Sequence, residues 1–286
     1  MTILGRVMAY QRPFLEAIAG VGLLATAPAS VSFLLASLVV SALWHDPADG
    51  HRVVAACCTW QATDLPRGPL LPLLGSAYGP TWGRFVQRTY PTPGNHEYMT
   101  RGAIGYYRYF GSRAAAPVRP WYSFRLGSWH LVALNSNCRS VDCAAEAAWL
   151  RADLAHHLAR CTLAYWHHPR FSSGHEGETR AVGPFWDALY AAGADLVLNG
   201  HDHDYERFAL QDPLGHLDPV NGIREFVVGT GGAPWLPFRT VAANGRVRTT
   251  GTFGVLRLTL RPGGYRWRFV HAAGAPFSDH GSGICH

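Results

Sequence analysis

The chain has 286 residues, of which 48% are hydrophobic and 15% are charged, and this composition excludes a disordered protein and allows one large domain or two small ones. The net charge of +6 comes entirely from arginine, because the sequence contains no lysine. These arginines are scattered along the chain. We therefore expect no nucleic-acid binding, which requires clustered basic residues.

The N-terminal segment predicts export. Arg6 and Arg12 precede a stretch from Ala17 to Trp44 that contains no charged residue. A basic start, an apolar stretch and the small-residue pattern ATAPAS (25–30) are typical of a secretory signal. The stretch also exceeds the roughly 20 residues that span a bilayer, so an uncleaved anchor that associates with a membrane is the first alternative. A buried N-terminal helix is the second alternative.

After about residue 50, apolar runs alternate with breaks rich in glycine and proline. Apolar runs that end in a polar residue indicate strands, and apolar residues at helical spacing indicate helices. Strands are predicted at 51–57, 130–136, 161–166, 194–199, 224–230, 253–260 and 265–270, and helices at 147–158 and 182–193. Strands that alternate with helices and are followed by strands alone indicate one α/β domain with two packed sheets.

Six cysteines are consistent with an exported protein. Cys138 and Cys143 flank the short polar loop CRSVDC and predict a local disulfide. The adjacent cysteines at positions 57 and 58 cannot easily pair with each other. Cys161 and Cys285 can pair with each other or with that doublet, and the sequence leaves both pairings open.

Residues that commonly bind metals follow three of the apolar runs. They are Asn95 and His96 in TPGNHEY (92–98), His167, His168 and His175 in AYWHHPRFSSGHEGE (164–178), and His201 and His203 in LNGHDHDYER (198–207). Ligands of α/β sheets bind where strands end, and imidazole and carboxamide groups both coordinate metals. Each motif alone is equally compatible with a turn, a core histidine or a solvated surface, but the three in this order predict a metal site.

The motifs GNHE, HHP and GHDHDYER, in this order, resemble those of the calcineurin-like metallophosphoesterases, and most closely the secreted bacterial branch related to purple acid phosphatases. The resemblance extends from GPTWGRF (79–85) to the C-terminal GSGICH. It implies an α/β fold, a four-layer α/β/β/α sandwich over residues 46–286 with an incomplete N-terminal part. Residues 1–45 are then the signal peptide or membrane anchor, and the protein is secreted or associated with the cell envelope.

The same resemblance implies hydrolysis of a small-molecule phosphate ester by a metal-bound hydroxide at a site with two divalent or transition metal ions (Fe, Zn or Mn). Asn95, His167 and His201 resemble ligands of one metal, and His203 resembles a ligand of the other. His96 resembles the histidine that contacts the phosphate and helps to protonate the leaving group. The resemblance also implies supporting residues. His175 resembles a second phosphate contact, although this match is weaker. The residues expected to surround the ligands, without binding metal themselves, are His168, Asp202, Asp204 and Glu206.

Two aspartate motifs that the family carries upstream of GNHE are missing, because the chain contains no GD dipeptide. Without bridging anions, two dications about 3.5 Å apart repel each other by on the order of 19 kcal/mol at an effective dielectric of about 20. Asp64, the only acid between Ala55 and Glu97, can replace the bridging aspartate or cap a helix, and we favour the cap.

The sequence therefore leaves three hypotheses on function open. The first is an active phosphoesterase with two metals. The second is a degenerate family member that binds one metal and has weak or no activity. The third is an extracellular binding module held by disulfides.

Overall fold

The computed structural model describes residues 38–46, 50–56, 82–272 and 277–286. The expectations for Asp64 and for the cysteine doublet at 57 and 58 lie outside the described residues, as do residues 1–37 of the signal or anchor expected over 1–45. In the described part of the chain, no helix is long and apolar enough to cross a membrane.

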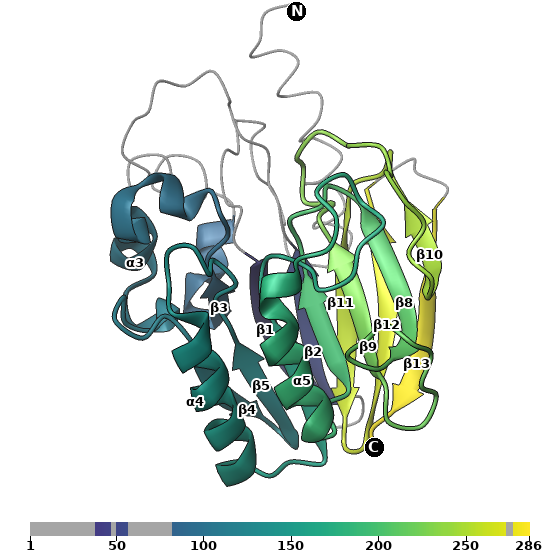
Figure 1. Ribbon diagram of the computed structural model, residues 1–286, viewed down its shortest axis with the longest axis horizontal. Coiled ribbons are helices and arrows are strands. Elements are labelled where there is room, and N and C mark those ends of the chain that lie inside the picture. The colour runs from purple at the N-terminus through teal and green to yellow at the C-terminus, as the bar shows by residue number, and fades with distance from the viewer. Residues whose placement is uncertain (1–37, 47–49, 57–81, 273–276) are drawn as a thin grey trace, which may run out of the picture.

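Seven strands form one sheet in the order β10-β8-β9-β7-β6-β5-β4 (Figure 1). They are β4 (Tyr122–Leu126), β5 (Trp129–Ala133), β6 (Cys161–Tyr165), β7 (Leu196–Asn199), β8 (Tyr205–Gln211), β9 (Ile223–Val228) and β10 (Gly245–Thr249). The neighbours β5, β6, β7 and β9 are parallel. Each coincides with a predicted strand, and their carboxyl ends all lie at one edge of the sheet.

Six antiparallel strands form the second sheet in the order β13-β12-β11-β2-β1-β3. They are β1 (Leu38–Asp46), β2 (Gly50–Ala56), β3 (Thr89–Thr92), β11 (Gly254–Arg261), β12 (Gly264–His271) and β13 (His280–Ile284). The predicted strands at 51–57, 253–260 and 265–270 are confirmed as β2, β11 and β12. Strand β1 was not predicted, because an uncharged apolar run is typical both of a buried strand and of a membrane segment.

Helices α4 (Cys143–His156) and α5 (Gly183–Ala191) confirm the two predicted helices. Helix α4 begins earlier than predicted because the Asp142 carboxylate accepts hydrogen bonds from the amides of Ala144 (3.1 Å) and Ala145 (3.0 Å), a cap that stabilises a helix by about 1 kcal/mol. The remaining helical segments are α3 (Ile104–Phe110), η2 (Trp82–Arg88), η3 (Glu97–Met99), η4 (Arg101–Ala103), η5 (Gly111–Ala114) and η6 (Arg180–Val182).

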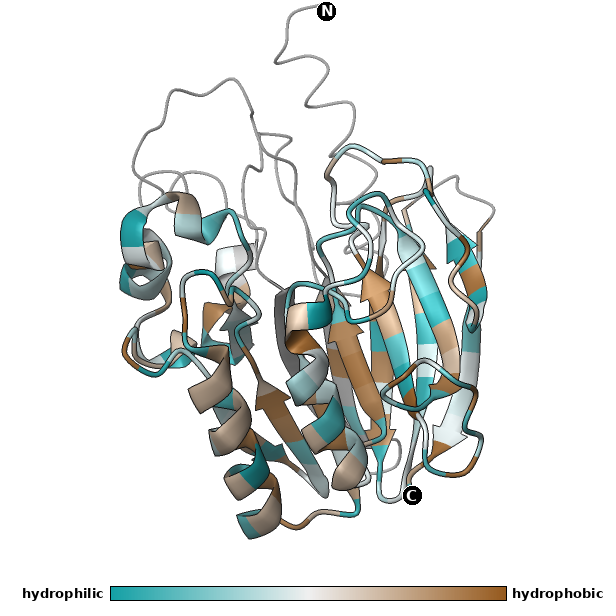
Figure 2. Cartoon of the chain, viewed as in Figure 1, coloured by the Kyte–Doolittle hydropathy of each residue, from teal (hydrophilic) through white to brown (hydrophobic). Residues whose placement is uncertain are grey.

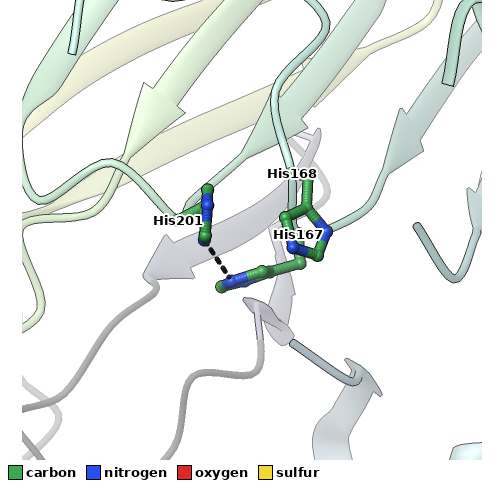
Figure 3. Close-up of side chains that lie close together, drawn as sticks. All are labelled: His167, His168 and His201. Carbon is green, nitrogen blue, oxygen red and sulfur yellow. Dashed lines mark hydrogen bonds between the residues drawn. The ribbon is translucent and has the colours of Figure 1, made fainter. Parts of the chain in front are cut away.

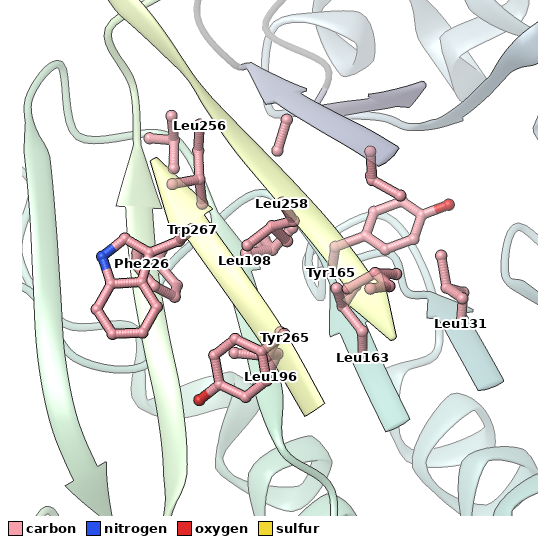
Figure 4. Packing of buried hydrophobic residues seen from close by; sticks show 14 of the residues in the cluster. Leu131, Leu163, Tyr165, Leu196, Leu198, Phe226, Leu256, Leu258, Tyr265 and Trp267 are labelled. Carbon is pink, nitrogen blue, oxygen red and sulfur yellow. The ribbon is translucent and has the colours of Figure 1, made fainter. Parts of the chain in front are cut away.

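Within the described residues, two hydrophobic cores hold the layers together, and the most apolar strands lie in the centre (Figure 2). Between the sheets, residues such as Leu256 and Leu258 of β11 pack against residues such as Leu163 of β6 and Leu198 of β7 (Figure 4). On the other face of the seven-stranded sheet, residues of α4 and α5 such as Leu150 form the second core with β-strand residues. The described residues thus show three layers of the expected four-layer sandwich, namely helices, sheet and sheet.

Two disulfides lie within the described residues. Cys138–Cys143 confirms the predicted local bridge. Cys161 pairs with Cys285, which decides between the two pairings that the sequence left open. Because Cys161 begins β6 and Cys285 directly follows β13, this second bridge links the two sheets to each other.

Candidate metal centre

Three of the predicted ligands meet beyond the carboxyl ends of the strands. The Nε2 atom of His167, after β6, lies 2.9 Å from the Oδ1 atom of Asn95, which follows β3. The same nitrogen lies 3.1 Å from the Nδ1 atom of His201, which follows β7 (Figure 3). The structure therefore brings together, from three segments far apart in the sequence, the three residues that the motifs assigned to one metal.

The spacing of these atoms fits a metal ion. An ion with bonds of about 2.1 Å and bond angles near 90° separates neighbouring ligand atoms by about 3 Å, and the observed separations are 2.9 and 3.1 Å. The Nε2 atom of a neutral His167 carries at most one proton, so it cannot donate a well-aligned hydrogen bond to both neighbours. One shared cation would satisfy all three ligand atoms together.

The histidines of the centre are held in the neutral form that coordinates metals. Burial, followed by the proximity of other histidines, lowers the pKa of His201 to about 3. Burial likewise lowers the pKa of His167 well below its usual value, with neighbouring histidines adding to the effect. Because only an unprotonated ring nitrogen has a lone pair to donate, these histidines are in the protonation state that coordinates a metal at neutral pH.

His168 lies closer to the ligands than the motifs indicated. Its ring nitrogen belongs to a group with those of His167 and His201 in which all ligand atoms lie within 4.8 Å of one another. Burial, with His96 adding to it, lowers the pKa of His168 to about 4. Its Nδ1 atom lies 2.8 Å from the hydroxyl of Ser136, which the sequence analysis did not single out although it is the polar last residue of the strand predicted at 130–136.

A left-handed backbone at His201 turns the loop after β7. The φ angle of His201 is 67°, which is uncommon for a residue other than glycine and is typically found at functional sites. The loop also packs tightly against Gly229 at the end of β9, where a Cβ atom would lie 1.6 Å from the carbonyl oxygen of Asp202. The absence of a side chain at position 229 thus allows this loop to approach the sheet.

Two acids of the GHDHDYER motif fasten neighbouring loops. The carboxylate of Asp202 accepts a hydrogen bond from the hydroxyl of Ser172 and another from the amide of Glu176 at 2.7 Å. The carboxylate of Glu206 accepts hydrogen bonds from the amide (2.8 Å) and the hydroxyl (2.5 Å) of Ser173. These bonds tie the loop after β6 to the chain after β7, which is the supporting role expected of these acids.

The turn that carries Asn95 and His96 is held from both sides. The carboxylate of Glu97 accepts a hydrogen bond of 2.6 Å from the amide of Gly94. The side-chain amide of Asn137, beyond β5, donates to the carbonyl of Pro93 at 3.1 Å. The end of β3 is thereby fixed to the end of β5. As a result Asn95, which follows a strand of the six-stranded sheet, lies at the carboxyl ends of the parallel strands of the seven-stranded sheet.

The other predicted residues lie around the three ligands. Burial, followed by the proximity of His203, lowers the pKa of His96 to about 4. The Nδ1 atom of His203 lies 2.9 Å from the carbonyl oxygen of Pro234. His175 is near enough to contribute to the lowered pKa of His203. Within the described residues, no carboxylate belongs to the group of ligand atoms around His167.

Comparisons with known proteins find similarity to phosphoesterases. A family model described as calcineurin-like phosphoesterase matches residues 68–205. Purple acid phosphatase 15 of Arabidopsis thaliana is 32% identical over 170 residues, which cover 53% of this chain and 32% of the relative. A phosphoenolpyruvate phosphatase of Allium cepa is 32% identical over 151 residues, which cover 44% of this chain and 31% of the relative.

The fold is also shared with a solved structure. A purple acid phosphatase from seeds of yellow lupin (Lupinus luteus) matches with a TM-score of 0.60 and 16% sequence identity, over 73% of this chain and 44% of that chain. The chain spans about a third of the length of the curated relatives it matches. Residues 68–205 are thus similar to the calcineurin-like phosphoesterase family, and the chain shares its fold with a purple acid phosphatase.

Proposed function

We propose that this protein hydrolyses small-molecule phosphate esters with metal ions held at the candidate centre. The observation that carries the proposal is the convergence of Asn95, His167 and His201 at separations of 2.9 and 3.1 Å. The phosphatase domain match covers the same residues. In this setting a bound cation lowers the pKa of a water molecule and stabilises the charge on the phosphoryl oxygens.

We propose separate roles for the individual residues of the centre. We assign Asn95, His167 and His201 to one ion and His203 to a second. We assign the phosphate contact to His96, which directly follows Asn95 and lies near enough to His203 for that histidine to lower its pKa. Ser136 fixes the ring of His168, and a histidine so oriented supports the ligands next to it.

The degenerate, one-metal hypothesis is the alternative, and one observation favours it. In the part of the chain that the structure describes, the ligand atoms at the centre come from imidazoles and one carboxamide, without a carboxylate. These groups are neutral, so they leave the mutual repulsion of two dications without compensation. A single ion needs no such compensation and fits the three ligands present.

Metal content and hydrolysis together separate these functions. The protein is purified, loaded with Zn²⁺, Mn²⁺ or Fe ions, dialysed and analysed for bound metal, and its hydrolysis of an aryl phosphate is measured. We expect His201→Ala to lose metal and activity. The control His216→Ala should keep both, because His216 is exposed and lies on a loop where it pairs with Asp212.

The outcomes are distinct. Two ions per chain and turnover that excess chelator abolishes support the two-metal phosphoesterase. One ion and hydrolysis no faster than in buffer support the degenerate alternative. His96→Ala tests the phosphate contact, because turnover should fall while metal content stays unchanged. Loss of metal in that variant would show that His96 is a ligand instead.

We also propose that the protein is exported. The two disulfides of the described residues support this, because disulfides persist in oxidising compartments and are rare in the cytosol of most cells. Expression with and without residues 1–37, followed by fractionation of cells and medium, tests the signal or anchor proposed for residues 1–45 and leaves strand β1, which begins at Leu38, in place. Retention of both forms inside the cell would contradict export.

A further inference from the structure

A second group of metal-binding side chains lies away from the candidate centre. The ligand atoms of His130, Asp153 and His157 all lie within 4.8 Å of one another. His130 is the second residue of β5, Asp153 lies on α4, and His157 directly follows the end of that helix. None of the motifs that led to the candidate centre includes these three residues.

The group lies at the opposite edge of the sheet. His130 pairs with Thr162 near the start of β6, whereas the candidate centre begins with His167 just after the end of that strand. Five residues of extended strand separate these two positions, which corresponds to about 16 Å. The second group therefore shares no ligand with the candidate centre.

The geometry favours a common cation. Asp153 and His157 are four residues apart, so they extend from one face of the helix, and the His157 Nδ1 atom lies 2.9 Å from Asp153 Oδ1. Across the interface with β5, the His130 Nε2 atom lies 3.0 Å from Asp153 Oδ2. Tetrahedral Zn²⁺ with bonds of about 2.0 Å separates its ligands by about 3.3 Å, so small adjustments of these side chains suffice.

The buried members of the group are incompletely satisfied. His130 is only 1% exposed, and its Nδ1 atom has no hydrogen-bond partner among the described residues. Its Nε2 atom and the Oδ2 atom of Asp153 contact each other at 3.0 Å and have no other partner in that part of the chain. A cation bound between this imidazole and this carboxylate would be coordinated by both.

The local charge and the solvent access of the group also favour binding of a cation. The group lies at the C-terminal end of the 14-residue helix α4, where the helix dipole favours a cation. The side chain of His157 is 52% exposed, so an ion can reach the buried pair from solvent, and water can complete its coordination. Two imidazoles and one carboxylate form a ligand set typical of zinc.

We propose that His130, Asp153 and His157 form a second, structural metal site that takes a zinc-like divalent transition ion and ties the end of α4 to β5. The proposal does not depend on the proposed phosphatase function, because the two sites have no residue in common.

The test compares two neighbouring histidines. His157→Ala removes the accessible ligand, and His156→Ala removes an exposed histidine one residue away that belongs to neither site. Both substitutions are made in the full chain that also carries His201→Ala, which disables the candidate centre. Each protein is stripped with chelator and titrated with Zn²⁺ alone, and bound metal is counted after equilibrium dialysis.

We expect the His156 variant to bind one more Zn²⁺ per chain than the His157 variant. Co²⁺ should give the visible absorption of a tetrahedral site only in the former, and Zn²⁺ should raise the melting temperature of the former alone. Equal Zn²⁺ binding by the two proteins, or a Co²⁺ spectrum that survives in the His157 variant, would overturn the proposal. With the candidate centre intact, His157→Ala should leave phosphate-ester hydrolysis unchanged, so failure of one proposal does not imply failure of the other.

Discussion

The disulfide between Cys161 and Cys285 should contribute far more to stability than the one between Cys138 and Cys143. The first closes a loop of 124 residues and the second a loop of 5. A cross-link restricts the unfolded chain by an entropy that grows with the logarithm of loop length. At 25 °C this relation gives about 4.9 kcal/mol for the long loop and about 2.1 kcal/mol for the short one.

Urea unfolding of Cys285→Ala and Cys138→Ala measures this difference. Each substitution breaks one disulfide and keeps the other cysteine of that pair. Cys161, which is fully buried, is therefore retained in Cys285→Ala, and the packing around it is not lost. We expect the free energy of unfolding to fall by about 3 kcal/mol more in Cys285→Ala than in Cys138→Ala. Equal losses, or a larger loss in Cys138→Ala, would refute the reasoning.

Two further predictions concern a buried acid and a loop contact. Burial raises the pKa of Asp195 from 3.8 to about 6, so the folded protein binds the proton of this carboxyl group more tightly than the unfolded chain does. The resulting contribution to the free energy of unfolding, about 3 kcal/mol, is fully present below pH 3.8 and is lost as the pH rises through 6. Urea midpoints at pH 4 and pH 8 should therefore differ less in Asp195→Asn than in the wild type; an unchanged difference would contradict the assignment. Gly229→Ala should weaken metal binding at the candidate centre by about 10–100-fold, because the new Cβ atom would lie 1.6 Å from the Asp202 carbonyl oxygen and displace the loop. Gly183→Ala, whose Cβ atom would meet only Arg170 at 3.9 Å, is the control, and full metal content in Gly229→Ala would disprove the role of this contact.

The parallel strands could be predicted from the sequence because each is an apolar run that ends abruptly at polar residues. In β6 and β7, buried apolar residues run directly into His167 and into the loop with His201, and such a boundary is visible without any alignment. The edge strands were harder. In β13 (HGSGI) and β10 (GRVRT) small and charged residues give little hydrophobic alternation, and these strands form because a neighbouring strand supplies their hydrogen bonds.

The convergence of Asn95, His167 and His201 could be predicted from motif order, but their contacts could not. Asn95 and His201 are more than a hundred residues apart, and only the topology of two sheets brings them to the same nitrogen of His167. Ser136 was missed for a related reason. A serine after a strand is common in sequences, and only the position of His168 shows that this hydroxyl has a defined partner.

The electrostatics of the centre limits what these residues can do alone. Asp202 and Glu206, two acids of the GHDHDYER motif, already accept hydrogen bonds from Ser172 and Ser173. Turning either carboxylate toward a metal would release the loop that carries His175 and leave a buried serine without its partner. The described ligands are therefore neutral, and the positive charge of any bound ion must be balanced by other anions, of which a phosphate ester is one. This imbalance favours binding of an anionic substrate, whereas holding two ions in its absence requires further carboxylates.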